Sequence, residues 1–116
     1  MVGKTSAKFD VATQDKTATV ILEGIILLDQ AKALRTFLDA VLTFPGNRWI
    51  LQLENLKLIS HRGMQALCDF AREIRKRGYE VEIAGIDPVV LEAFKTSRLL
   101  GYFSRSDKCI IKSPRD

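Results

Sequence analysis

The side chains with the greatest chemical reactivity in this chain are few and scattered. Ser60 and His61 are neighbours, whereas Cys68 and Cys109 lie far apart. A hydrolytic site needs a histidine beside a nucleophile and an orienting carboxylate, but adjacent residues on a helix point away from each other. The cysteines lack the short spacing of a zinc site. The sequence therefore predicts a protein that is not an enzyme, with no metal, no cofactor and two reduced, buried thiols.

A cluster of cations, formed by Arg72, Arg75, Lys76 and Arg77, raises the possibility of nucleic-acid binding. Glu73 interrupts the cluster, and helical geometry spreads the four cations around the cylinder. The cluster also falls in the last turn of an expected helix, where cations interact favourably with the helix dipole. No aromatic stacking set or glycine clamp lies nearby. We therefore interpret it as a solvated helix end and expect no nucleic-acid partner.

The composition is that of an ordinary globular domain. The chain has 116 residues, of which 47% are hydrophobic and 28% charged, and 18 basic against 14 acidic residues give a net charge of +4. We expect a single domain over residues 1–116 with an ordered core of about residues 7–111. The apolar runs fall short of the ~20 residues of a membrane helix, and the N-terminus has no secretory signal. The expected compartment is the cytoplasm, without membrane insertion.

The periodicity of apolar residues changes along the chain and indicates alternating strands and helices. Two short runs around a polar turn predict an N-terminal antiparallel hairpin. The nearly continuous apolar segment 48–53 is typical of a strand covered on both faces, and segment 54–59 is expected to be a loop. The expected strands are residues 7–12, 17–22, 48–53, 79–84 and 107–111, and the expected helices begin near Asp29, Ser60 and Pro88.

This order predicts an α/β fold with a mostly parallel central sheet, an N-terminal antiparallel hairpin and helices packed against the sheet. Helix N-caps are expected at Asp29, Ser60 and Asp87, because short polar side chains accept hydrogen bonds from the first free amides. Pro88 suits the first position of its helix, and Gly78 suits the end of the second helix.

Four stretches in this order resemble the STAS domain family, which includes the bacterial anti-sigma factor antagonists. The stretch 59–67 aligns with the family signature Ile-Asp-Ser-Ser-Gly-Leu-Gly-Ala-Leu. The other three are residues 20–24, 49–56 and 82–88. The resemblance covers about residues 17–103. It implies a binding module that docks an anti-sigma factor with serine kinase activity, which ends the interaction by phosphorylating the serine before the signature glycine.

The chain departs from the family pattern where that switch would lie. Ser60 stands at the aspartate position, His61 at the first serine and Arg62 at the phosphoacceptor serine, while Gly63 is retained. Leu27 replaces a residue that is usually acidic in the family. Since arginine cannot accept phosphate from a serine kinase, we expect docking without the usual switch.

Several of these residues have more than one interpretation. Ser60 either caps the second helix or serves as a displaced phosphorylation site. Arg62 either pairs with a partner carboxylate or is simply solvated, and His61 is either a surface histidine or a pH sensor. The surface that the resemblance implies for a partner comprises Leu27, Asp29, Ser60, His61, Arg62, Gly63, Met64, Gln65 and Asp69.

The leading interpretation is a protein-binding regulator similar to anti-sigma factor antagonists, with a kinase-like anti-sigma factor as partner. The alternative is an accessory STAS subunit of a membrane transport assembly of the lipid-transport ABC type, with a transporter ATPase as partner. A phosphotransfer or nucleotide-binding domain is a third interpretation. A homodimer through Tyr102 or Phe103 is also possible.

Overall fold

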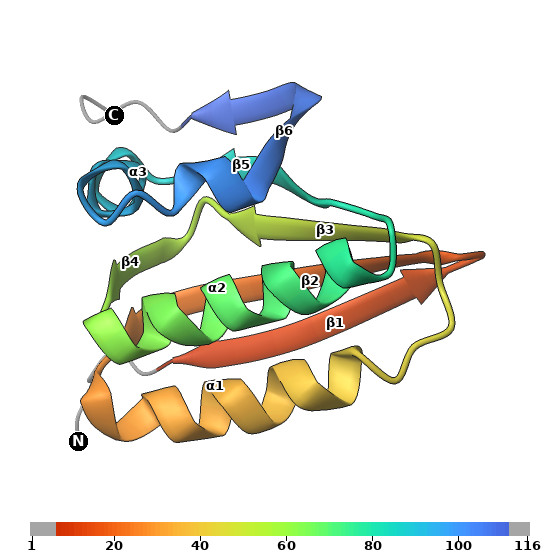
Figure 1. Cartoon of the computed structure of the whole chain (residues 1–116). Coiled ribbons are helices and arrows are strands. Elements are labelled where there is room, and N and C mark those ends of the chain that lie inside the picture. The colour runs from red at the N-terminus through yellow and green to blue at the C-terminus, as the bar shows by residue number, and fades with distance from the viewer. Residues whose placement is uncertain (1–6, 112–116) are drawn as a thin grey trace.

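The computed structural model describes residues 7–111, and for residues 104–111 it describes the backbone alone. The elements are β1 (Lys8–Gln14), β2 (Thr17–Ile26), α1 (Leu28–Val41), β3 (Arg48–Leu53), β4 (Leu56–Ile59), α2 (His61–Lys76), β5 (Val81–Ile86), α3 (Pro88–Thr96), a short 3-10 helix (Leu100–Tyr102) and β6 (Phe103–Ile111). The strand order is β1-β2-β3-β5-β6, with β4 also paired to β2 (Figure 1). The β1–β2 pair is antiparallel and the other pairs are parallel. This confirms the α/β fold with an N-terminal hairpin.

Segment 54–59 was expected to be a loop, and this expectation is wrong for its last four residues. Residues Leu56–Ile59 form β4, which pairs with the last part of β2. Gly24 has a φ of 88° and donates its N–H to the carbonyl of Asn55 at 2.9 Å, where the register between the strands shifts. Because a glycine tolerates this left-handed conformation, β2 continues past it to Ile26 and is longer than the predicted 17–22.

Helices α1 and α2 lie side by side over one face of the sheet (Figure 1). On that face, Ala18, Val20 and Leu22 of β2 are fully buried, whereas the alternate residues of β2 are partly exposed. Strand β3 follows the same pattern, since Trp49 is buried and Ile50 is partly exposed. The prediction that segment 48–53 is covered on both faces is therefore wrong, because α1 and α2 pack on one face only and α3 lies beside β4.

Helix α2 has an apolar stripe that packs into the core, with Met64, Leu67, Ala71 and Ile74 buried. Cys68, expected to be buried, is free and only half-buried, because it lies at the margin of this stripe. The side chain of Cys109 lies outside the described residues.

Two strand boundaries differ from the sequence expectation. Strand β5 begins at Val81, and Tyr79, expected within it, lies before it with 41% of its surface exposed. The centre of its ring lies 5.7 Å from the ring centre of the buried Trp49, and this contact explains an aromatic residue at that position. Strand β6 begins at Phe103 rather than at residue 107.

The N-terminus of α1 also differs from the expectation. Leu27, and not Asp29, occupies the N-cap position, and the side chain of Gln30 caps the helix by accepting the N–H of Leu27 at 2.8 Å. Asp29 lies exposed in the first turn, where a carboxylate interacts favourably with the helix dipole. The N-cap predicted at Asp87 is confirmed, since its carboxylate accepts the N–H of Val89 at 2.9 Å.

Candidate protein-docking site

Helices α1 and α2 begin next to each other at one edge of the sheet. Helix α1 follows β2 and α2 follows β4, and these two strands are parallel neighbours. The N–H of Ser60, just before α2, donates to the carbonyl of Ile26 at 2.7 Å, close to the start of α1. Figure 1 shows both helices starting at the left side of the molecule, beside β4 and α3. The sheet therefore brings the sequence-predicted segments around Leu27 and Ser60 together.

Ser60 caps α2. Its hydroxyl oxygen accepts the N–H of Gly63 at 3.1 Å, and its backbone is extended, as an N-cap requires. The cap predicted from the sequence is confirmed. This hydrogen bond holds the Ser60 side chain against the helix end.

Gly63 and Met64 lie beneath the surface. A Cβ atom added to Gly63 would lie 2.8 Å from Cγ1 of Ile59 and 3.2 Å from Cγ2 of Ile26, so only glycine lets α2 approach β2 and β4 this closely. Met64 is 8% exposed, and its sulfur lies 3.8 Å from the hydroxyl of Ser97. These two residues position the helix start, whereas His61, Arg62 and Gln65 beside them are exposed.

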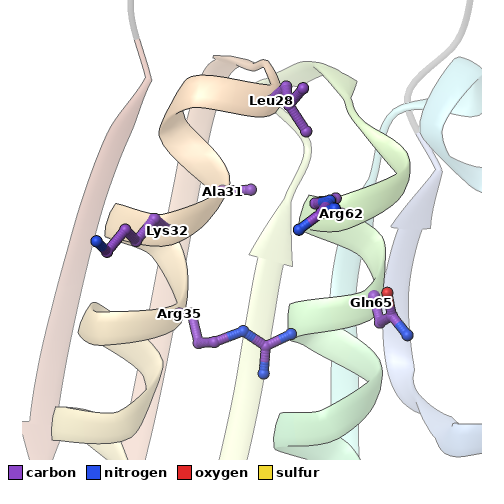
Figure 2. Close-up of a pocket in the computed structure, with 6 residues that line it drawn as sticks. All are labelled: Leu28, Ala31, Lys32, Arg35, Arg62 and Gln65. Carbon is purple, nitrogen blue, oxygen red and sulfur yellow. The ribbon is translucent and has the colours of Figure 1, made fainter.

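A groove of about 420 Å³ runs between the first turns of α1 and α2. Figure 2 shows Arg62 reaching from α2 toward α1, and Arg35 reaching from α1 toward α2. The residues that line the groove are Leu28, Ala31, Lys32, Arg35, Arg62 and Gln65. Three of these six side chains are cationic, so the groove is suited to an anionic group.

The groove is bounded by an ion pair. Arg35 Nη1 lies 2.9 Å from Oδ2 of Asp69, and Arg72 approaches the other oxygen of this carboxylate at 3.9 Å. Asp69, predicted as a contact residue, thus also links the two helices.

Large apolar side chains are exposed at the same edge of the sheet. Leu27 immediately precedes α1, and Leu28 is its first residue. Leu58 lies in β4, and Val89 lies in the first turn of α3. Their exposed fractions are 48%, 64%, 47% and 60%. Sequence analysis singled out Leu27 but missed the other three. The signal it could have used is the Leu27-Leu28 pair, since one of two adjacent leucines at a helix start must face away from the core.

A family model described as "Mlab, STAS domain" matches residues 9–103. The chain belongs to the STAS domain family. A comparison with curated proteins found no match.

Solved structures of other STAS proteins share this fold. An anti-sigma factor antagonist from Mycobacterium paratuberculosis superposes with a TM-score of 0.78 at 17% identity, over 92% of this chain and 91% of that one. The anti-sigma factor antagonist SpoIIAA in its unphosphorylated form gives a TM-score of 0.71 at 16% identity, over 87% and 90%. The phosphorylated form of SpoIIAA, a Bacillus cell fate determinant, gives 0.64 at 15% identity, over 87% and 93%. At these identities the likeness shows the fold.

The basic cluster of this STAS domain is engaged within the chain itself. Arg72 lies near Asp69, Arg75 donates to the carbonyl of Gly101, Lys76 lies near Glu73, and Arg77 donates to the carbonyl of Leu42. The guanidinium of Arg75 also lies 5.6 Å from the ring centre of Tyr102. The sequence predicted a solvated helix end, and these contacts show that the four side chains also bind residues of their own chain.

Within residues 7–111, no helix is both long enough and apolar enough to cross a membrane. Among the described residues, no group of three or more His, Cys, Asp or Glu side chains is placed to hold a metal ion.

Proposed function

We propose that this STAS domain is a regulatory module that binds another protein through its docking edge, defined as the four exposed apolar side chains Leu27, Leu28, Leu58 and Val89. The observation that carries the proposal is the exposure of four large apolar side chains at one edge of the sheet, where α1 follows β2, β4 pairs with β2, and α3 contacts β4. Exposed apolar side chains that gather in one place mark protein–protein contacts more often than singly scattered ones. Such patches are typically surrounded by polar residues, as this one is by His61 and Arg62.

The likeness to anti-sigma factor antagonists supports the class of partner. We propose a kinase-like anti-sigma factor, bound in the cytoplasm. Arg62 replaces the serine that the family phosphorylates, and the Ser60 hydroxyl is engaged as a helix cap. The association is therefore constitutive and is not ended by phosphorylation at this position.

Arg62 also favours a second candidate function. An accessory STAS subunit of a transport assembly needs a permanent docking surface and no phosphoserine, and an arginine at this position satisfies both conditions. In that case the partner is a transporter ATPase. The two candidates share the docking edge and differ in the protein that it binds.

The docking edge is tested with the variant Leu28→Asp/Val89→Asp. The tagged wild type and variant are used to recover partners from the source cells, and the recovered proteins are identified by mass spectrometry. We expect the wild type to recover a kinase-like regulator or a transporter ATPase, and the variant to lose it, because a charge in an apolar contact must be desolvated.

Val11→Asp is the matched control, since Val11 is 37% exposed but lies on β1, away from the docking edge. It should recover the same partner as the wild type. Fluorescence of Trp49, the single tryptophan, confirms that each variant is folded. Equal recovery by the docking-edge variant and the wild type would refute the proposal.

A further inference from the structure

We propose that the cationic part of the α1–α2 groove binds an acidic segment of the partner protein. This inference rests on the proposed function and specifies the chemistry of the partner. The segment would place carboxylates against Arg62, Arg35 and Lys32, and an apolar side chain against Leu28.

The charge in this groove changes sign along its length. The part near the helix starts is lined by Lys32, Arg35 and Arg62. Farther along α1 and α2, the groove continues as a second hollow of about 220 Å³. Arg35 lines both parts, and the acidic residues of the second part are Asp39, Asp69 and Glu73. The groove therefore suits an occupant with acidic residues at the helix starts and basic residues farther along.

Two of the three cations are left without an ion pair in the described chain. Arg35 is paired with Asp69, but neither Lys32 nor Arg62 forms an ion pair among the described residues. Arg62 also lies in the first turn of α2, where the helix dipole disfavours a positive charge. A carboxylate from a partner would give Arg62 a counter-charge and would offset its unfavourable interaction with the helix dipole. Lys32 turns its ammonium toward the outer side of α1 in Figure 2, and its four-carbon stem can carry that charge to a ligand at the groove.

The exposed lining of the groove favours a protein segment over a small molecule as its occupant. Small-molecule sites hold their ligand with a few fixed polar groups in an enclosed, largely apolar cavity. Here the polar groups are the ends of long, exposed side chains, and no polar or charged residue of the described chain is buried. Leu28, 64% exposed at the mouth of the groove, offers an apolar contact beside the cations. A segment that carries both carboxylates and an apolar side chain matches this lining.

The change of sign also argues against an anionic membrane as the occupant. A lipid surface of one charge would be attracted to Arg62 and Lys32 but repelled by Asp39 and Glu73 on the same face. A protein segment can match both halves, because its charges are ordered along its length. A second copy of this chain, packed antiparallel, would also place acidic residues against the cationic part of the groove and basic residues against its acidic part. The test therefore includes the oligomeric state.

The probe is a fluorescein-labelled helical peptide with glutamates and one leucine in its first half and lysines in its second half. A control peptide carries glutamine in place of each glutamate. Fluorescence anisotropy with the full chain measures the affinity, and amide chemical shifts locate the site. We expect the acidic peptide to bind with an affinity that falls as salt is added, and to shift amides at residues 28–35 and 62–65. The glutamine peptide should not bind.

The groove variant is Lys32→Glu/Arg62→Glu, and we expect it to lower the affinity for the acidic peptide by about tenfold or more. Lys16→Glu/Lys95→Glu changes the net charge equally at exposed sites outside the groove and should bind as the wild type does. Equal affinity of the two double variants would overturn the inference. So would binding of anionic phosphatidylglycerol vesicles without peptide binding, or a wild-type dimer that dissociates in the groove variant.

The two proposals fail in different ways. If the groove variant recovers the cellular partner as well as the wild type does, while Leu28→Asp/Val89→Asp loses it, the docking edge stands and the acidic-segment inference is overturned. If the wild type binds the acidic peptide in the groove but the docking-edge variant recovers every partner, the proposed function fails instead.

Discussion

Arg35 of α1 and Asp69 of α2 form an ion pair across the groove, with 2.9 Å between Nη1 and Oδ2. The two side chains are 47% and 44% exposed, so the pair is half-solvated. It lies where the cationic part of the groove gives way to the acidic part. The pair therefore links the two helices and sets how much positive charge Arg35 presents to a ligand.

Removing the carboxylate of Asp69 should strengthen the binding of an acidic ligand. In Asp69→Asn, Arg35 loses its counter-charge, and we expect the affinity for a peptide that carries only the glutamate and leucine half of the probe, without its lysines, to rise about threefold at low ionic strength. The cost in unfolding free energy should be no more than ~1 kcal/mol, because exposed ion pairs contribute little. Fluorescence anisotropy measures the affinity. Glu92→Gln, which removes an exposed carboxylate near Lys95, is the control and should leave it unchanged.

Arg62→Glu should stabilise the fold while weakening docking. A negative charge in the first turn of α2 interacts favourably with the helix dipole, and we expect the unfolding free energy to rise by ~0.3–1 kcal/mol. Urea unfolding followed by Trp49 fluorescence measures this change. Arg62→Gln should fall between the wild type and Arg62→Glu. A loss of stability in Arg62→Glu would contradict the prediction and would mean that the arginine makes a stabilising contact.

Gly63→Ala should destabilise the protein, since its Cβ would lie 2.8 Å from Cγ1 of the buried Ile59. Separating α2 from β4 enough to remove this overlap costs ~1–3 kcal/mol, the usual range for overpacking. Gly101→Ala is the matched control, because a Cβ at Gly101 meets no atom within 4 Å. The melting temperatures of the two variants provide the measurement. Similar values for both would show that α2 can shift freely.

Ser60→Ala should cost ~1 kcal/mol of stability, because the N–H of Gly63 loses its acceptor. Ser60→Asp should retain the cap and favour the helix dipole, so its stability should equal or exceed that of the wild type. Chemical denaturation distinguishes the two. Incubation of the wild type with the recovered partner and labelled ATP tests whether Ser60 accepts phosphate, and we expect no label there. Label that Ser60→Ala removes would show that the phosphorylation switch has moved to Ser60.

Local features of the fold were predictable wherever near neighbours in the chain decide them. The caps at Ser60 and Asp87 follow from polar side chains placed just before helical periodicity, and the structure confirms both. The cap expected at Asp29 is wrong because the pairing of β2 with β4 ends at Ile26, Leu27 is the extended N-cap residue, and the helix already begins at Leu28. Strand β4 was missed because it has only four residues and an irregular burial pattern, so its sequence lacks a strand period.

The amino-acid sequence by itself determined the alternation of strands and helices, the amphipathic α2, and the replacement of the family's phosphoacceptor by Arg62. Those properties depend on residue type and on short spacings. Only the tertiary structure decided that Arg62 lies across a groove from Lys32 and Arg35, and that Leu58 and Val89 share an edge with Leu28. The physical reason is the parallel pairing of β2 with β4, which starts α1 and α2 at one edge of the sheet. Long-range pairing of this kind leaves no local signal in the residues that it brings together.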